Sequence, residues 1–196
     1  MEDVEFNLKP GSGQMSIFEV QTIDGAPEGS RAPLERLQQV FGMVPNVAGI
    51  IANSPVLAKI FVPLFEGVHA GTFTEAEIQT LLLTNAVTNS CAWAVAFHSY
   101  LAIKAGLDPG DVEAIRKRRA PKEPRTAALS AYARDLIEKR GHVGDAVVEA
   151  FLSAGFKPDQ ALETLAVSAA STITNYALTI AEPPLEPIFQ KYAWRA

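Results

Sequence analysis

Residues 74–106 read TEAEIQTLLLTNAVTNSCAWAVAFHSYLAIKAG, and this stretch predicts two consecutive helices with a short break at residues 88–90. Thr74 and Glu77 have the spacing of a capping box, in which a hydroxyl and a carboxylate each pair with a free amide at the start of a helix. The first helix is therefore predicted to be buried over much of its circumference, because its apolar residues form a wide stripe: Ile78, Leu81, Leu82, Leu83, Ala86 and Val87.

The second helix is predicted to follow at once. Asn89 or Ser90 can cap its start, and its end is marked by Lys104 in the last turn and by Gly106, which readily adopts a left-handed backbone. The alternation of apolar and polar residues that strands require is nearly absent along the chain. The sequence therefore predicts an all-α fold, a helical bundle built around this central antiparallel pair.

Shorter helices are expected on both sides of the pair. Pro33, Pro55 and Pro109 each suit the first turn of a helix, where the missing amide of proline costs no hydrogen bond. His69 is expected near the end of the helix that begins at Pro55, where it would interact with the helix C-terminus. Further helical segments are expected at residues 46–53, 125–139, 145–154 and 156–181, with an amphipathic tail at 185–194.

The composition suits one medium-sized domain, with 196 residues of which 48% are hydrophobic. Residues 1–31 are rich in glycine, proline and charge, so we expect an extended arm there and a single domain over residues 32–196. The net charge is −5, from 17 basic and 22 acidic residues. This balance argues against a nucleic-acid or anionic-membrane partner.

The single cysteine excludes an internal disulfide and fits a reducing, cytoplasmic setting. The first residues are acidic and lack the apolar core of an export signal. No run of about 18 strongly apolar, uncharged residues is found, so no membrane span is expected.

The cysteine and a histidine are the candidate reactive groups. Cys91 falls at the start of the second helix, where free amides and the helix dipole favour a thiolate. His98 lies seven residues later on the same face, about 10 Å along the axis, with the small Ala94 between them. Such a pair suits nucleophilic or redox chemistry. Alternatively, Cys91 is a small core residue and His98 a buried polar group with satisfied hydrogen bonds.

One motif begins with a turn at Asn89 and Ser90, continues with Cys91, Ala94 and His98, and ends in Ala-Gly-Leu at residues 105–107. This motif resembles that of the carboxymuconolactone decarboxylase and alkylhydroperoxidase D (AhpD) superfamily. The resemblance implies an AhpD-like helical bundle that forms dimers, trimers or hexamers and uses neither a cofactor nor a metal. Further segments are similar to a long, peroxidase-related branch of that family: residues 41–46, 52–55, 140–143, 174–176 and 184–185.

The sequence also departs from the family pattern. In the hydroperoxidase members the second cysteine of a pair attacks the peroxide, and Ala94 stands at that position here. A glutamate twelve residues before the first cysteine belongs to their proton relay, and here that residue is Gln79. Decarboxylase-type members usually carry a glutamate at the position of Ala94. An intramolecular dithiol–disulfide cycle is impossible with one cysteine.

Three functions are therefore considered. The leading hypothesis is an alkylhydroperoxidase-like enzyme of the peroxiredoxin type, in which the Cys91 thiolate attacks a small hydroperoxide and an external thiol reduces the sulfenic acid. In that scheme His98 relays a proton and Gln79 orients it, while Trp93 and Phe97 help to wall the substrate pocket beside Ala94. The second hypothesis is a lyase or hydrolase that acts on a small organic acid, a lactone or keto acid, with His98 as acid or base. The third is an oligomeric scaffold or binding module that has lost catalysis.

Overall fold

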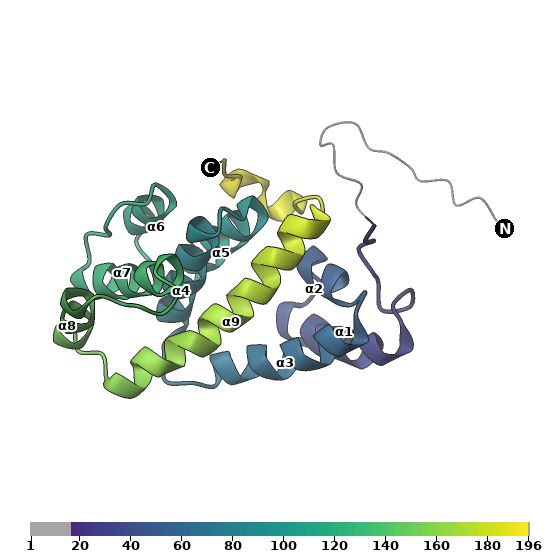
Figure 1. Ribbon diagram of the computed structural model, residues 1–196. Coiled ribbons are helices and arrows are strands. Elements are labelled where there is room, and N and C mark those ends of the chain that lie inside the picture. Colours follow the sequence, from purple (N-terminus) through teal and green to yellow (C-terminus); the bar gives the residue numbers. More distant parts are fainter. Residues whose placement is uncertain (1–16, 196) are drawn as a thin grey trace.

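The computed structural model describes residues 17–195, and this part of the chain is entirely helical, without strands. The prediction of an all-α fold is confirmed (Figure 1). The elements are α1 (Glu28–Phe41), α2 (Asn46–Ile51), α3 (Pro55–His69), α4 (Glu75–Thr88), α5 (Ala92–Lys104), α6 (Pro109–Arg116), α7 (Pro124–Glu138), α8 (Asp145–Ser153), α9 (Pro158–Ala181) and the 3-10 helix η1 (Pro187–Tyr192).

The central pair is formed by α4 and α5. The capping box of α4 is present, since Thr74 and Glu77 each accept a hydrogen bond from the backbone amide of the other. The predicted cap of α5 was wrong: the residue at the N-cap is Cys91, which makes no side-chain capping bond. Ser90 is instead used to turn the chain, with a left-handed φ of 55°. Gly106 follows α5 with φ 96°, as its position predicted.

The interior lies around α4, which packs against α5, α7 and α9. Ten consecutive residues of α4, from Ile78 to Val87, are buried, among them the polar side chains of Gln79, Thr84 and Asn85. In Figure 1 the long helix α9 runs diagonally across the molecule, with α1 to α3 on one side and α4 to α8 on the other. Both groups contact α9, which therefore joins them into one body.

Some helix ends differ from the predictions. Helix α1 begins at Glu28, inside the segment expected to be an extended arm, and Pro33 lies within the helix rather than at its start. The helix is kept despite the backbone hydrogen bond that the proline lacks, and Leu34 and Leu37 on its inner face are buried. The expected arm otherwise falls largely on residues 1–16, outside the described residues.

The end of the chain supplies one wall of the site. The expected amphipathic tail contains η1, whose Phe189 is buried against α5, with its ring centroid 5.0 Å from Phe97 and 5.4 Å from Tyr100. Among residues 17–195 no helix is long and apolar enough to cross a membrane.

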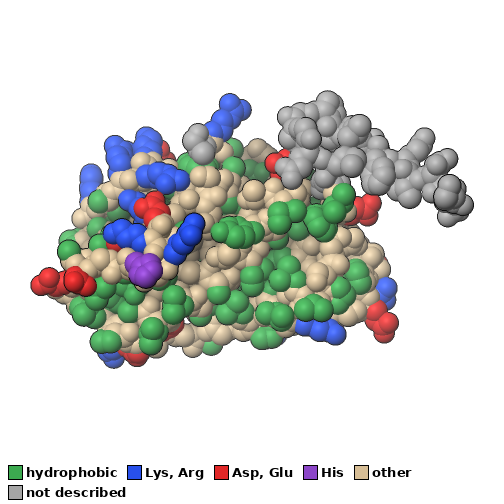
Figure 2. Space-filling view, in the orientation of Figure 1, with side chains coloured by type: hydrophobic (Ala, Val, Ile, Leu, Met, Phe, Trp, Pro, Cys, Tyr) green, Lys and Arg blue, Asp and Glu red, His purple; other side chains and the backbone are tan. Residues whose placement is uncertain are grey.

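The surface seen in Figure 2 shows many hydrophobic side chains over α9 and α3, while Lys and Arg gather mainly at the end near α6. The exposed apolar residues of these two helices are Val56 and Ile60 of α3, and Leu162, Leu165, Tyr176 and Ile180 of α9. This apolar face agrees with the expected subunit contacts, which remain a prediction.

Candidate active site

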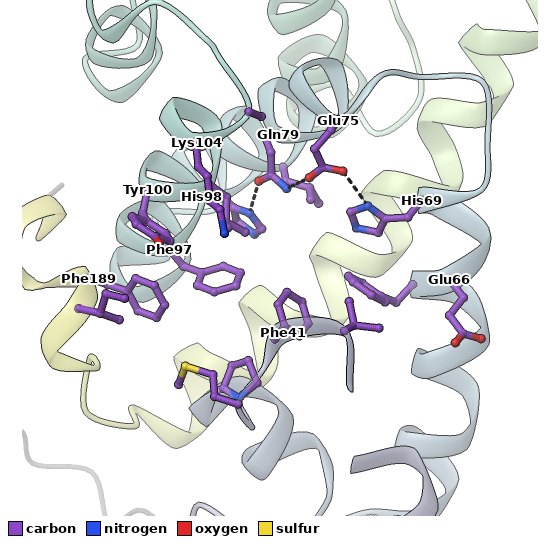
Figure 3. A pocket seen from close by; sticks show the side chains of 18 of the residues that line it. Phe41, Glu66, His69, Glu75, Gln79, Phe97, His98, Tyr100, Lys104 and Phe189 are labelled. Carbon is purple, nitrogen blue, oxygen red and sulfur yellow. Dashed lines mark hydrogen bonds and ion pairs between the residues drawn. The ribbon is translucent and has the colours of Figure 1, made fainter. Parts of the chain in front are cut away.

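A cavity of about 800 Å³ opens beside the central pair, between α1, α3, α4, α5 and η1 (Figure 3). Its walls are mostly apolar, and its aromatic side chains come from four different elements: Phe41, Phe65, Phe97, Tyr100 and Phe189. Two histidines, a glutamate and a glutamine lie together along one wall: His69, Glu75, Gln79 and His98.

These four polar residues form one continuous chain of hydrogen bonds. His98 Nδ1 lies 2.9 Å from Gln79 Oε1, and Gln79 Nε2 donates to Glu75 Oε1 at 2.7 Å. Glu75 Oε2 in turn lies 3.0 Å from His69 Nδ1. Figure 3 shows the two histidines at the ends of this chain, both facing the cavity. The three helices α3, α4 and α5 thus place these four side chains in a fixed order.

The order of donors and acceptors fixes the tautomer of His98. A carboxylate only accepts hydrogen bonds, so the Gln79 amide must turn its NH₂ group toward Glu75 and its oxygen toward His98. His98 Nδ1 therefore carries the proton, and the lone pair of the neutral ring is on Nε2. The result is an imidazole whose free nitrogen can accept a proton.

The charge state of His98 follows from its burial. Its pKa is lowered from 6.5 to about 3, chiefly by burial and in smaller part by the nearby His69, while the negative charge of Glu75 opposes the shift. The pKa of Glu75 is lowered chiefly by its hydrogen bond with His69. At neutral pH the wall thus carries a neutral His98 and an ionised Glu75.

The environment of Cys91 differs from the expectation of a favoured thiolate. Burial raises the pKa of the Cys91 thiol, and the nearby Ala94 amide, Thr179 hydroxyl and Trp93 amide only partly oppose this effect. The side chain is 3% exposed. The helix start does supply amide donors, but desolvation outweighs them. Cys91 is not among the described residues that line the cavity.

A small inner cavity of about 50 Å³ adjoins the large one. The inner cavity has lining residues that the large one lacks, among them Trp93, Ala94 and Thr174. Cys91 does not line the inner cavity either. The two cavities share several lining residues, with His98 among them: Phe41, Pro45, Phe65, His69, Leu82, Phe97 and His98. His98 therefore stands where the two spaces meet.

The predicted site residues thus fall into three groups. Gln79, Phe97 and His98 line the large cavity, Trp93 and Ala94 line the inner one, and Cys91 lies apart from both. Neither cavity is lined by a thiol among the described residues, because Cys91 lies outside both and the residue at the family's attacking position is Ala94.

Sequence reasoning missed several charged or titratable residues that line the large cavity. Glu75 precedes Gln79 by four residues, so helical spacing could have placed both on one face. His69 was expected only at a helix end, and the turn at residues 70–74 brings it to Glu75. Arg36 and Lys104 also line the cavity, and no local pattern links them, since they come from different helices. In residues 17–195 no group of three or more His, Cys, Asp or Glu side chains could hold a metal ion.

Comparisons with known proteins identify the fold. A peroxidase-related protein from Ralstonia eutropha JMP134, described as an alkylhydroperoxidase AhpD core, superposes with a TM-score of 0.76 at 20% identity, covering 91% of this chain and 96% of its own. A peroxidase-related protein from Silicibacter sp. TM1040 gives 0.73 at 18% identity, covering 93% and 96%.

A third similar structure is a variant of the debrominase Bmp8 in complex with 2,3,4-tribromopyrrole, with a TM-score of 0.75 at 15% identity, covering 93% of this chain and 97% of its own. No family model and no curated protein sequence matches the chain. The likeness is thus one of structure, extends over more than nine-tenths of the chain and confirms the predicted resemblance at the level of the fold: this protein has the AhpD-like all-α fold.

Proposed function

We propose that this protein is an enzyme in which His98 acts as a general base and acid on a small organic acid, such as a keto acid or a lactone acid. The observation that supports this function best is the neutral His98 ring, which donates from Nδ1 to Gln79 and leaves Nε2 free beside a cavity of about 800 Å³. A neutral imidazole held in one tautomer presents its lone pair to a proton on a carbon next to a carbonyl group, or on a water, and its low pKa makes it a weaker base than an ordinary histidine.

The lining of the cavity supports the substrate class. Phe41, Phe65 and Phe189 suit an apolar body, while Lys104 and Arg36 suit an anionic group. Arg36 already pairs with Glu66, whereas the exposed Lys104 forms no ion pair within residues 17–195, so we assign the anion to Lys104. The substrate would then reach from Lys104 inward to His98, which lies six residues earlier on the same helix.

In this scheme His98 Nε2 removes the proton, and the electrons of the broken bond move toward the carbonyl oxygen. Gln79 holds the ring in place and Glu75 holds Gln79, so these two residues position His98 without touching the substrate. Completion of the reaction returns the proton from Nε2 to the product or to the leaving oxygen. The scheme requires no thiol.

The test is proton exchange in D₂O with a panel of small keto acids and lactone acids, followed by NMR. Wild type should incorporate deuterium next to the carbonyl of at least one compound. The His98→Asn variant should lose the exchange by at least a hundredfold, since it lacks the basic nitrogen, while Cys91→Ser should retain it. Exchange that survives in His98→Asn, or that no compound of the panel shows, would reject the proposal.

A thiol hydroperoxidase, the leading hypothesis from sequence, is a second candidate because one observation favours it. The Ala94 and Trp93 amides and the Thr179 hydroxyl lie near the Cys91 sulfur and favour its charged form, while burial outweighs them. The thiol would have to become accessible, since it is buried. Peroxide consumption with an added thiol distinguishes the two: dependence on Cys91 supports the peroxidase, and equal rates in wild type and Cys91→Ser reject it.

A further inference from the structure

His69, the last residue of α3, is the second imidazole of the cavity and takes no part in the removal of a proton by His98. It lines both cavities, and Figure 3 shows its ring turned toward the space that the His98 ring also faces. The His69 side chain is 26% exposed, whereas His98 is 8% exposed. His69 is therefore accessible both to a molecule in the large cavity and to the solvent that supplies it with protons.

Glu75 leaves one nitrogen of His69 for a ligand. His69 Nδ1 lies 3.0 Å from Glu75 Oε2, and this hydrogen bond is the main cause of the lowered pKa of Glu75. An ionised carboxylate only accepts hydrogen bonds, so Nδ1 carries a proton and donates it to Glu75. Within residues 17–195 the ring makes no second hydrogen bond, so Nε2 is unused. A carboxylate at one ring nitrogen also stabilises the imidazolium form, in which Nε2 carries a proton that the ring can give away.

The His69 ring is held in place by contacts from three helices. On its own helix it packs against Phe65, with the two ring centroids 4.4 Å apart. Glu75 of α4 holds Nδ1, and the turn between α3 and α4 is anchored to α9 by Glu163. The Thr72 amide donates to Glu163 Oε1 at 2.7 Å, and the Thr72 hydroxyl donates to Oε2 at 2.5 Å. His69 is thus fixed at the cavity by the protein before any ligand binds.

The charges in the cavity favour a proton donor opposite His98. If His98 alone removed a proton from a carbon next to a carbonyl, an imidazolium and a negative oxygen would form together in a mostly buried site. Burial and the nearby His69 both lower the pKa of His98 and so oppose that imidazolium. A proton passed from His69 to the carbonyl oxygen removes the second of these effects and leaves the oxygen uncharged. The cavity then keeps one imidazolium, which has moved from His69 to His98.

We infer that His69 is the general acid of this site, which donates its Nε2 proton to the carbonyl oxygen of the substrate while His98 Nε2 takes the proton from the adjacent carbon. The C–H bond breaks and its electron pair forms the C=C bond of an enol. The π pair of the carbonyl group moves to the oxygen, which binds the proton from His69. For the reaction, this inference rests on the proposed function of His98. The substrate class narrows to 2-keto acids that carry a hydrogen on the carbon next to the carbonyl, with the carboxylate at Lys104.

The contact between His69 and a carbonyl oxygen can be tested without catalysis. The probe is 4-methyl-2-oxopentanoate labelled with ¹³C at its carbonyl carbon, and 4-methylpentanoate, which lacks the carbonyl group, is its control. Binding to wild type at mildly acidic pH should move the ¹³C signal downfield, and His69→Leu should abolish this movement. His69→Leu should also bind the probe about tenfold more weakly, with unchanged affinity for 4-methylpentanoate.

The proton itself is tested by deuterium exchange of the probe in D₂O as a function of pH. In wild type the exchange rate should fall on the alkaline side, with its midpoint where NMR shows the His69 ring losing its proton. His69→Gln keeps a hydrogen-bond donor but no acid, so it should exchange at least about a hundredfold more slowly and without that fall. His142→Gln is the matched control, because His142 is exposed and lines neither cavity. The NMR titration separates His69 from the other titratable groups around the cavity: Arg36, Glu66, Glu75, His98, Tyr100 and Lys104.

The outcomes separate this inference from the proposed function. If His98→Asn loses the exchange while His69→Gln keeps both the rate and the alkaline fall, the function of His98 stands and the role of His69 is overturned. A probe that does not bind, or a carbonyl signal that moves equally in wild type and His69→Leu, overturns it as well. If the signal depends on His69 but wild type exchanges no deuterium, the contact with the carbonyl oxygen stands and the function of His98 fails. The wild-type midpoints decide the matter even if the His69 variants do not fold.

Discussion

His98 Nδ1 lies 2.9 Å from Gln79 Oε1, although nineteen residues and a turn separate the two along the chain. Gln79 stands about as far before the α4–α5 turn as His98 stands after it, so the antiparallel pairing of the helices brings them together. Each side chain is buried, and each satisfies a polar atom of the other. This hydrogen bond thus joins the two central helices and also fixes the orientation of the His98 ring at the cavity.

Replacement of Gln79 by Leu should therefore affect both stability and the state of His98. The variant leaves the Nδ1–H of His98 buried without an acceptor, so we expect a loss of about 2 kcal/mol in the free energy of unfolding. In wild type, ¹⁵N NMR should show His98 protonated on Nδ1, and in Gln79→Leu a mixture of tautomers. Gln79→Glu is a control for the tautomer alone, because it keeps an acceptor for Nδ1–H but loses the donor to Glu75. An unchanged tautomer in Gln79→Leu would contradict the role assigned to this amide.

Stability should depend on pH through His98. Its pKa is lowered from 6.5 to about 3 by burial, so below pH 6.5 the unfolded chain binds a proton that the folded chain does not. The stabilising contribution is present above pH 6.5 and is lost as the pH falls toward 3. Between pH 6.5 and 5 we expect a loss of about 2 kcal/mol in wild type that is absent in His98→Asn. Urea unfolding of both proteins at the two pH values measures the difference.

The same low pKa has a consequence for catalysis. If His98 is the base, its free nitrogen stays unprotonated throughout the mildly acidic range, so kcat should show no fall attributable to this residue between pH 8 and 5. A kcat profile with an acidic limb near pH 6.5 would show that His98 is solvated like an ordinary histidine. The profile of Cys91→Ser should match that of wild type.

Cys91 should react slowly with thiol reagents in the folded protein. Its side chain is buried and its pKa is raised by that burial, so both access and the thiolate fraction are low. We expect labelling by a disulfide reagent at pH 7.5 to be at least about a hundredfold slower than in urea. Labelling as fast as that of an exposed cysteine would instead favour the thiol hydroperoxidase.

The fold could be predicted largely from local signals, and the site only in part. The capping box at Thr74 and Glu77 and the glycine at Gly106 act over a few residues, so the sequence displays them. The Gln79–His98 contact could be anticipated because one turn joins the two helices. His69 and Lys104 could not be placed, since their positions depend on how α3 and α5 pack across the cavity. The thiolate expected at Cys91 is not favoured, because burial raises the pKa of the thiol, and burial is a property of the whole fold and not of the helix position.

Lys104 should determine the preference for anionic substrates. It lines the large cavity six residues after His98, and we expect Lys104→Ala to raise KM for an acid substrate about tenfold with little change in kcat. Lys122→Ala is the control, because that exposed lysine does not line either cavity. The effect should shrink at high salt and vanish for the corresponding methyl ester. Equal effects on acid and ester would show that Lys104 acts through packing.

The apolar face of α9 predicts association with further copies of the chain. Leu165 and Ile180 are 48% and 56% exposed on this helix, which also exposes Leu162 and Tyr176, and exposed apolar surface of this kind can mark a protein contact. We expect wild type to form a dimer or a larger oligomer, and Leu165→Glu with Ile180→Glu to dissociate it, as measured by light scattering after size-exclusion chromatography. Leu152→Glu on α8, an exposed apolar residue away from this face, is the control. If wild type is monomeric at micromolar concentration, or if Leu152→Glu dissociates the oligomer equally, α9 is not the contact surface.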